Sequence, residues 1–408
     1  MIGCGGIIQE AVAKHLPLRI VFLTYGDNNQ WSFLLYRWHP VILPKAIRKM
    51  GLVRYHEALA ASVVLGVPTE QLTFLGYPDF GTLQIWTSHW GDRNPFRSLL
   101  TRVTAVPYDN ALRFGAPYKG EEVLRDLTTV IREFRPTKIF VSHPADHMPD
   151  HRALYLFTRV ALWDVEKEMR PTLYPYLVHF VRWPTPRGYQ PADWLVPPST
   201  LLSQWPWIVH WLTPSQVQRN YQAIKAHRSQ YRYSAAYLLS FIRPNELFGD
   251  APPITFSSTA STALERKGLI NQAPEELTEE ERATFIGVEV RSVQLEDREL
   301  IYSIECSRPL AKAVEASVYL FGYRADRPFA QMPKLHVKIG ALSHEVFDQD
   351  RLLPNKAVTL SRGLRQITLR VSLETLGEPQ RILTSARTYL GELPLDWVSW
   401  RVLELPSP

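Results

Sequence analysis

The sequence contains little cysteine. Its two cysteines, Cys4 and Cys306, stand far apart in a chain of 408 residues. Two cysteines cannot build a disulfide framework or a cysteine-rich zinc site, so any metal must be held by histidine and carboxylate side chains. Low cysteine content is usual in the cytosol and compatible with the periplasm, and we expect a cytoplasmic protein.

Long apolar runs and clusters of basic residues are also missing. No apolar run approaches the roughly 18 residues of a membrane span, and residues 1–6 lack the basic stretch of a signal peptide. The net charge of +6 is mild for this length, and lysines and arginines are scattered. The sequence predicts neither a membrane span nor nucleic-acid binding, and it gives no indication of an oligomeric state.

The overall composition is typical of a globular protein. Hydrophobic residues make up 45% of the chain and charged residues 21%, which is wrong for a disordered protein. A domain usually takes roughly 100–200 residues, so the length predicts two domains.

The first part of the chain alternates helices with short buried strands. The expected helices are residues 7–15, 45–66, 121–134 and 150–164, and the expected strands are residues 18–24, 72–76 and 138–142. This order is typical of an α/β domain with a mostly parallel, Rossmann-like sheet, which we place at residues 1–250. Sites in such sheets form where strands end, so we expect the chemistry in the loops after residues 24, 76 and 142.

The pattern changes near residue 255, where alternation replaces helical spacing. Ile367, Leu369 and Val371 point one way along a predicted strand, and residues 317–323 and 397–405 are also expected to be strands. We predict an all-β sandwich domain at residues 283–408. A linker rich in serine, threonine and glutamate is expected at residues 256–282.

Residues 143–151 carry the strongest chemical signal. They hold three histidines and two aspartates in nine positions, between a strand and a helix. A catalytic zinc takes three protein ligands plus water, and His151 in the first helical turn is a candidate ligand, with Asp150 beside it to orient a ring nitrogen. The alternative is a polar loop whose aspartates cap the helix and whose histidines are solvated. Spacing alone leaves both interpretations open.

The same run reads His-Pro-Ala-Asp-His-Met-Pro-Asp-His, and with it the chain resembles the PIG-L/LmbE-like deacetylases. These zinc hydrolases remove acetyl from N-acetylglucosaminyl groups of glycolipids, thiol precursors, chitooligosaccharides and antibiotics. The resemblance covers about residues 1–240. Further agreements are residues 3–6, Thr24, Gly26, Arg54, Glu57, Asp79 and residues 227–230.

The resemblance implies a role for several residues. It makes His151 a zinc ligand and Asp150 the residue that orients the active-site histidine. Arg54 and Asp79 match substrate-side or structural positions that line the pocket, and His227 is placed near the site by the same analogy.

Each substrate-side residue also has a plainer interpretation. Arg54 and Glu57, three apart on one helix face, can form an exposed pair. Asp79 can be a turn residue, and His227 can be a histidine on a helix surface. For residues 27–29, a turn is slightly favoured over a place in the pocket.

The sequence departs from the family at two points. The family's His-Pro-Asp-Asp-Glu motif, which supplies two zinc ligands and the general base, is missing before the glycine-rich turn, so we expect the sequence to begin inside the domain, after its first strand. Met148 stands where the family has the histidine that stabilises the oxyanion, and a thioether donates no hydrogen bond. His147 is the candidate replacement, and His179 or His227 are other candidate donors.

These residues predict zinc-dependent hydrolysis of the acetamide of an N-acetylglucosaminyl-type sugar or glycoconjugate, with release of acetate. One alternative is a glycan-binding protein with an inactive deacetylase fold. Another is a zinc amidohydrolase that acts on a non-sugar amide. An in-frame His-Pro-Asp-Asp-Glu motif upstream of the first codon would favour the enzyme, and a closed frame would favour the binding protein.

Overall fold

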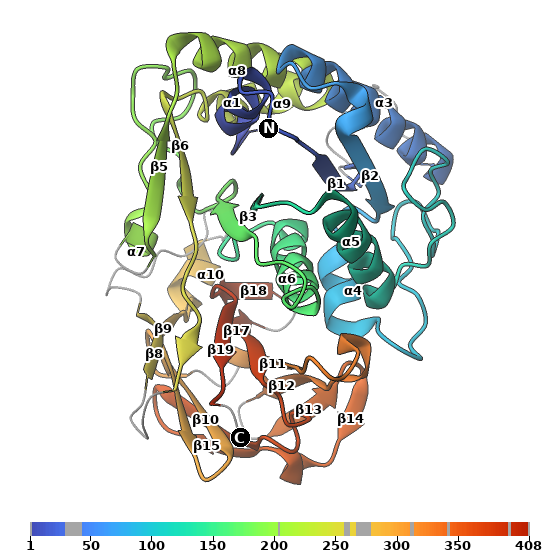
Figure 1. Cartoon of the computed structure of the whole chain (residues 1–408). Coiled ribbons are helices and arrows are strands. Elements are labelled where there is room, and N and C mark those ends of the chain that lie inside the picture. The colour runs from blue at the N-terminus through green and yellow to red at the C-terminus, as the bar shows by residue number, and fades with distance from the viewer. Residues whose placement is uncertain are drawn as a thin grey trace. The chain divides into compact units, whose positions relative to one another are not determined.

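The chain forms two compact units. Unit 1 comprises residues 1–198 and 206–250, and unit 2 comprises residues 199–205 and 251–408 (Figure 1). The structure, a computed structural model, describes residues 2–28, 43–202, 205–256, 262–266, 279–310, 314–340, 343–390 and 393–406. None of the helices in these ranges combines the length and the apolar character needed to span a membrane.

Unit 1 is a mixed α/β unit. Its strands are β1 (Ile20–Thr24), β2 (Leu72–Tyr77), β3 (Lys138–Ser142), β4 (Thr172–Tyr176), β5 (Trp207–Trp211) and β6 (Asn245–Gly249). Its α-helices are α1 (Gly5–Ala13), α3 (Pro44–Val64), α4 (Thr82–Ser88), α5 (Gly120–Phe134), α6 (Pro149–Asp164), α8 (Pro214–Ala226) and α9 (Arg228–Leu239). The predicted α/β class is confirmed, and the predicted helices and strands lie within a few residues of their expected ends.

The strands of unit 1 form pairs. β1 pairs with β2 and β3 pairs with β4, both in parallel, whereas β5 and β6 are antiparallel. Among the described residues no ladder joins the β1–β2 pair to the β3–β4 pair. Parallel pairing is therefore seen in the β1–β2 and β3–β4 pairs, and a single Rossmann-like sheet stays a prediction.

Helix α5 shows how the sequence sets these elements. Its buried residues recur at the helical period, among them Val123, Leu127 and Ile131. Glu121 and Glu122 occupy its first turn, where negative charge favours the helix dipole. The helix ends where Arg135 adopts a left-handed conformation with a φ of 51°.

Helix α6 carries the candidate site at its first turn. Met148 is its N-cap residue in an extended conformation, and Pro149 stands at the first helical position, where no backbone N–H is needed. The helix buries Ala153, Leu156 and Phe157. His151 is therefore held on a fixed first turn.

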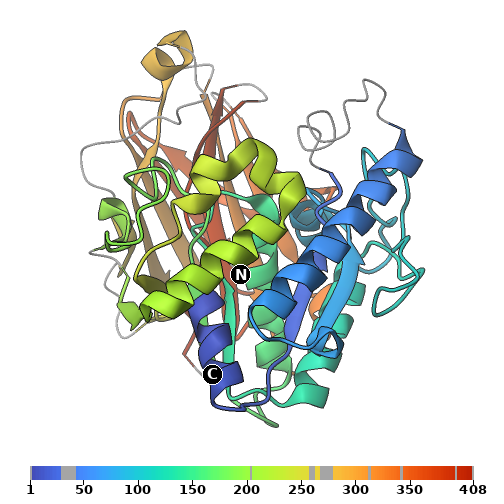
Figure 2. The ribbon, with the colours of Figure 1, turned by 90° about the horizontal axis from the view of Figure 1, so that it is seen from above.

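Helices α3 and α9 are joined by a buried carboxylate. Glu57 accepts hydrogen bonds from the backbone N–H of Ser229 at 2.7 Å and from its hydroxyl at 2.6 Å. Figure 2 shows α3 beside α8 and α9, which run in one layer, and α3 packs against both. Glu57 thus does not form the exposed helical pair considered for it, because its side chain faces α9.

Unit 2 consists mainly of β-strands in two sheets. The five-stranded sheet has the order β15 (Thr359–Arg362), β16 (Gln366–Ser372), β10 (Glu299–Cys306), β9 (Val288–Glu296) and β8 (Thr262–Arg266). The larger sheet has the order β14 (Arg351–Leu353), β13 (His344–Asp348), β12 (Lys334–Ile339), β11 (Val314–Tyr323), β17 (Arg381–Leu390), β19 (Arg401–Glu404) and β7 (Ile254–Thr255), with β18 (Leu393–Trp397) beside β17. Two short helices, α7 (Ser199–Leu202) and α10 (Glu279–Thr284), also belong to it.

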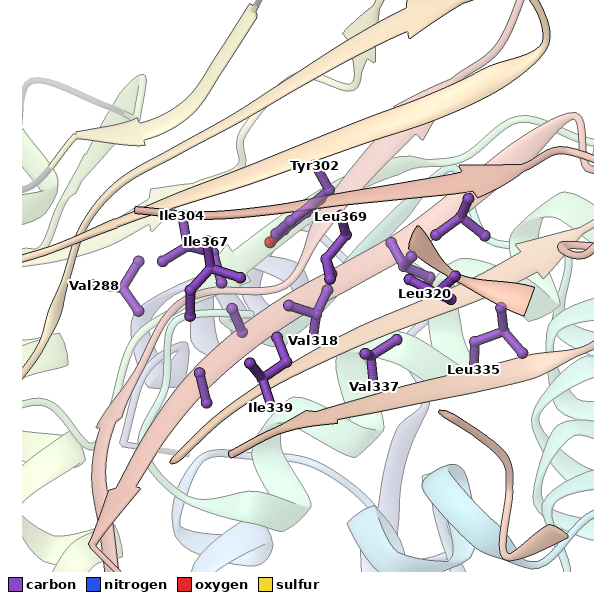
Figure 3. Packing of buried hydrophobic residues seen from close by; sticks show 14 of the residues in the cluster. Val288, Tyr302, Ile304, Val318, Leu320, Leu335, Val337, Ile339, Ile367 and Leu369 are labelled. Atoms are coloured by element: carbon purple, nitrogen blue, oxygen red, sulfur yellow. The ribbon is translucent and has the colours of Figure 1, made fainter. Parts of the chain in front are cut away.

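One hydrophobic cluster draws on both sheets of unit 2. Tyr302 and Leu369 come from the five-stranded sheet, and Val318, Leu320 and Val337 come from the larger one (Figure 3). All five are essentially inaccessible to solvent. We interpret unit 2 as two sheets packed face to face, as in the predicted sandwich.

Two expectations for the second half of the chain need correction. Residues 262–266, inside the expected linker, form β8 and pair with β9. Residues 397–405 were expected to be one strand, but β18 ends at Trp397 and β19 begins at Arg401. The rest of residues 257–278 lies outside the described part of the chain.

Candidate active site

The functional side chains gather in the loops that follow β1, β2, β3 and β4. Hydrogen bonds join these loops to one another. The N–H of Asn28, after β1, donates to Asp79, after β2, at 3.0 Å. The carboxylate of Asp150 reaches the loop after β2, and the N–H of His147, after β3, donates to the carbonyl of His179, after β4, at 2.8 Å. These residues therefore meet in the loops at the carboxyl ends of the four strands.

Asp146 is the organising carboxylate of this edge. Its Oδ1 accepts the N–H of Met148 at 2.9 Å, and its Oδ2 accepts the N–H groups of Val178 and His179, both at 2.9 Å. Asp146 is fully buried. Although burial opposes ionisation, the neighbouring His151 ring and the hydrogen bonds hold the pKa of Asp146 below its ordinary value. The carboxylate is therefore charged and fixed.

His151 is oriented by Asp146. Its Nδ1 lies 3.1 Å from Oδ2 of Asp146, and its side chain is 30% exposed. Burial disfavours the charged ring, but the Asp146 carboxylate outweighs it and raises the pKa of His151. The sequence pointed to Asp150 as the carboxylate that orients this ring, and the structure gives the contact to Asp146 instead.

Asp150 faces the loop after β2 because consecutive helical residues point about 100° apart. Its Oδ1 accepts the N–H of Thr82 at 3.1 Å and also its hydroxyl, and its Oδ2 accepts the N–H of Phe80. Phe80 has a left-handed φ of 57°. Burial and the negative charge of Asp79 raise the pKa of Asp150 to about 7. Asp150 thus holds the loop that carries Asp79.

His179 lies beside His151. The two ring centroids are 5.1 Å apart, and His179 is partly exposed. Nδ1 of His179 lies 3.0 Å from the hydroxyl of Tyr237, which donates to the carbonyl of Val178 at 2.7 Å. Burial, assisted by the positive charge of His151, lowers the pKa of His179 to about 4, so the ring is neutral near pH 7.

The predicted substrate-side residue Asp79 bridges two loops. Besides the N–H of Asn28, its own carbonyl accepts the side-chain amide of Asn28 at 3.0 Å. Its negative charge contributes to the raised pKa values of Asp27, Asp150 and His151. Asp79 is therefore close enough to His151, the candidate metal ligand, for its charge to act on that ring.

Arg54 reaches from α3 to the loop after β1. Its Nη1 donates to the carbonyl of Gly26. Gly26 has a φ of 67°, and a Cβ there would lie 2.6 Å from Nη1 of Arg54, so this position requires glycine. His227, between α8 and α9, is half-buried; burial lowers its pKa to about 4, and the charge of Arg54 adds to the effect.

Asp27, considered a turn residue, is buried. Its carboxylate accepts the hydroxyl of Tyr108. Burial, together with the charge of Asp79, raises the pKa of Asp27 to about 7. Asn28 makes the contacts with Asp79, and Asn29 lies outside the described residues.

His147, the candidate replacement for the missing oxyanion histidine, is exposed. Its ring lies 5.0 Å from that of Phe180, centroid to centroid. The remaining histidine of the run, His143, is fully buried, and its ring is stacked on that of Trp207 with centroids 5.4 Å apart. Burial lowers the pKa of His143 to about 3. His147 can thus meet a bound molecule, and His143 cannot.

Two contributors were missed by the sequence. Asp146 was visible in the run, and the expectation favoured Asp150 because it is adjacent to His151. Tyr237 had no signal at all, because it stands 58 residues after His179 among other tyrosines of α9. Only the three-dimensional contact identifies it.

The donor set for a metal is incomplete in the described residues. His151 has the features of a ligand, since a carboxylate holds its Nδ1 and its ring is partly exposed. Within the ranges that the structure describes, no group of three or more histidine, cysteine or acidic residues is arranged to hold a metal ion. The residues described therefore offer one candidate zinc ligand.

The fold and this edge define an α/β unit with a histidine–aspartate site. The family model of the GlcNAc-PI de-N-acetylases, PIG-L, matches residues 1–162 of this chain. The match ends earlier than the expected residue 240. No curated protein matches the chain in sequence.

Among solved structures, A40926 pseudoaglycone deacetylase Dbv21 is 14% identical, with a TM-score of 0.38 over 62% of this chain and 91% of that chain. A deacetylase of the teicoplanin biosynthesis pathway is 14% identical, with a TM-score of 0.39 over 61% of this chain and 92% of that one.

Proposed function

We propose that the protein hydrolyses the acetamide of an N-acetylglucosaminyl-type sugar or glycoconjugate and releases acetate. The observation that carries the proposal is the His151–Asp146 pair. The pair lies where β3 and β4 end, beside His179. Both residues fall in the part of the chain that the family model of the GlcNAc-PI de-N-acetylases matches.

Amide hydrolysis needs an oriented nucleophile and a group that moves protons. The edge offers two partly exposed imidazoles, His151 and His179, on a loop pair fixed by Asp146. It also offers Asp79 and Arg54, which we propose to line the substrate side. Met148, where the family has its oxyanion histidine, supplies no donor, so the proposed site differs from the family pattern there.

We further propose that the reaction depends on zinc, with His151 as the ligand that this part of the chain supplies. The support is chemical: a carboxylate-held imidazole is the usual form of a histidine zinc ligand. When bound, zinc polarises the acetyl carbonyl and its water. Within the described residues, no group of three or more candidate ligands forms around His151.

One observation favours a second candidate, a glycan-binding protein with an inactive deacetylase fold. Met148 occupies the position where the family has its oxyanion histidine, and a thioether donates no hydrogen bond. A zinc amidohydrolase acting on a non-sugar amide remains the third candidate, since nothing on this edge selects a sugar.

Acetate release tests the proposal. The full chain is incubated with N-acetylglucosamine, diacetylchitobiose, N-acetylglucosaminyl inositol and a non-sugar acetamide, each with added Zn²⁺ and with a chelator. We expect acetate from at least one sugar substrate, loss with chelator, and loss in His151→Ala. Binding of the sugars without acetate release would support the glycan-binding candidate, and release from the non-sugar amide alone would support the third.

A further inference from the structure

We propose that unit 2 binds an acidic glycan on the outer face of its larger sheet, where the guanidinium of Arg387 receives the carboxylate of a uronic-acid-type sugar. The outer face is the side of β11, β17 and β18 that carries Tyr319, Arg387, Tyr389 and Trp397. All four residues belong to unit 2, whereas His151 belongs to unit 1. Glycan binding there can therefore be tested without reference to the hydrolysis proposed for unit 1.

Arg387 and three aromatic residues share this face. Arg387 on β17 stands directly opposite Trp397 on β18, and opposite residues of paired strands point to the same side of a sheet. Tyr389 follows two residues after Arg387 and points the same way, and Tyr319 on β11 joins them because Arg387 lies over its ring. Val318, next to Tyr319, points to the opposite side, where it belongs to the hydrophobic cluster of unit 2 (Figure 3). The four side chains therefore lie outside that core.

The three rings hold the guanidinium by cation–π contacts. Its central carbon lies 4.2 Å from the ring centroid of Tyr389, 4.4 Å from that of Trp397 and 5.3 Å from that of Tyr319. All three distances are within the roughly 6 Å over which a ring attracts a cation. Arg387, Tyr389 and Trp397 are each partly exposed. The rings thus fix the guanidinium at a place that is open to solvent on part of its surface.

The hydrogen-bond donors of Arg387 have no acceptor in the described part of the chain. Among the residues that the structure describes, Arg387 donates no hydrogen bond and forms no ion pair, and its Nε is buried. A guanidinium carries five N–H donors and keeps its charge at ordinary pH. Because a charge without a hydrogen-bonded partner is costly to bury, a ligand that brings an acceptor is stabilised here.

The carboxylates of the same face do not neutralise Arg387. Acidic residues of this face, Glu315 and Glu345, are exposed, and in the described part of the chain neither forms an ion pair with Arg387. Burial lowers the pKa of Arg387, and the described group that opposes this effect is the hydroxyl of Tyr319. The positive charge of Arg387 is therefore available to an anion in solution.

A second cation of the same face is Lys338 on β12. Its ammonium lies 5.1 Å from the ring centroid of Phe347. Ser317 on β11 stands opposite both Lys338 and Arg387, so the two cations are separated by two strand spacings, about 10 Å. Burial lowers the pKa of the neighbouring His336 to about 3, and the charges of Arg387 and Lys338 act in the same direction. The face therefore presents positive charge along a row across the strands.

A carboxylated sugar matches both parts of this site. A guanidinium and a carboxylate form two parallel hydrogen bonds, because the two planar groups have matching geometry. The C–H face of a sugar ring packs on aromatic rings such as those of Trp397 and Tyr389, and ligand sites generally combine apolar walls with a few polar groups. A neutral sugar offers no partner for the charge of Arg387, and a small inorganic anion offers no apolar face. In a chain of uronic acids, a further carboxylate can reach Lys338.

Calorimetric titration of the full chain at low salt tests the site. The ligands are trigalacturonate, the neutral sugar maltotriose and inorganic sulfate. We expect trigalacturonate to bind and its affinity to fall as NaCl is raised, because salt screens the contact between charges. Maltotriose and sulfate should give no measurable binding at the same concentrations.

Variants locate the binding on the outer face. Arg387→Gln removes the charge and the planar fork, and we expect the Kd for trigalacturonate to rise about 10–100-fold, as for the loss of a hydrogen-bonded charge. Arg387→Lys keeps the charge but not the fork, and its Kd should lie between those of wild type and Arg387→Gln. Arg370→Gln, at an exposed position of β16 in the five-stranded sheet, removes the same charge and should bind like wild type.

Each outcome decides the proposal. An unchanged Kd in Arg387→Gln overturns the site, as does the absence of trigalacturonate binding. Equal affinity for maltotriose overturns the role of the carboxylate, and binding of sulfate without trigalacturonate identifies a simple anion site and overturns the glycan. A loss in Arg387→Gln that Arg387→Lys partly restores, with Arg370→Gln unaffected, supports the proposal.

Discussion

At the scale of single residues, Asp146 governs the candidate site. Its carboxylate accepts three backbone N–H groups and lies against His151. Of the groups that raise the pKa of His151, Asp146 has the largest effect, and it outweighs the lowering by burial. Removing the charge while keeping the shape should therefore change the ionisation of His151.

Asp146→Asn should lower the pKa of His151, because it removes the opposite charge that raises this pKa. The measurement is an NMR titration of chelator-treated protein labelled at histidine. Asp92→Asn, at an exposed position, is the matched control. A His151 pKa that is the same in both variants would contradict the assigned contact.

Asp27 makes the stability of unit 1 depend on pH. Its pKa is about 7 in the folded chain and near its ordinary value of 3.8 in the unfolded chain, so between these values the folded state holds a proton that the unfolded state has lost. The free energy of unfolding should therefore fall as the pH rises from about 4 to about 7. Asp150 acts in the same direction.

Asp27→Asn should flatten this dependence, since the amide oxygen still accepts the hydroxyl of Tyr108 but carries no charge. The gain in stability at pH 8 relative to pH 4.5 is on the order of 1.4 kcal/mol for each unit of pKa shift removed. Urea unfolding at the two pH values measures it. An equal pH dependence in wild type and variant would show that Asp27 ionises normally.

At the scale of elements, the contact between α3 and α9 depends on Glu57 and Ser229. Both are buried, and the carboxylate receives two hydrogen bonds from one residue. Ser229→Ala removes the hydroxyl and leaves a buried carboxylate with one donor fewer. Hydrogen bonds to charged groups contribute about 1.5–3 kcal/mol, and we expect a loss of stability in that range.

Chemical denaturation of Ser229→Ala gives this loss directly. Ser215→Ala, on the exposed first turn of α8, is the control and should differ from wild type by less than about 0.5 kcal/mol. Equal midpoints for the two variants would show that Glu57 does not depend on Ser229.

Most helices and strands could be predicted from the sequence, but the side-chain contacts between them could not. β3 and α6 follow from hydrophobic period and from proline at the first helical position, which are local signals. The pairing of Glu57 with Ser229 spans 172 residues, and no local pattern encodes it. The run at residues 143–151 located the site, but the choice between Asp146 and Asp150 depended on side-chain direction, which only the folded loop fixes.

At the scale of the whole molecule, unit 2 has a hydrophobic core drawn from both of its sheets. Unit 2 centres on one cluster that includes Leu320, which is fully buried (Figure 3). Leu320→Ala should cost about 2–5 kcal/mol, because it leaves a cavity between the two sheets. The lowered denaturant midpoint measures it, and Leu364→Ala, 75% exposed, should be nearly neutral. A small effect at Leu320 would mean that the cluster is not the core of the unit.

The hydrogen bonds to Asp146 have a consequence for amide exchange. The N–H groups of Met148, Val178 and His179 come from two loops, yet all three end on one carboxylate. None of them can exchange with solvent unless that carboxylate withdraws. Their protection should therefore rise and fall together, as a single opening unit that spans residues 30 apart in the chain.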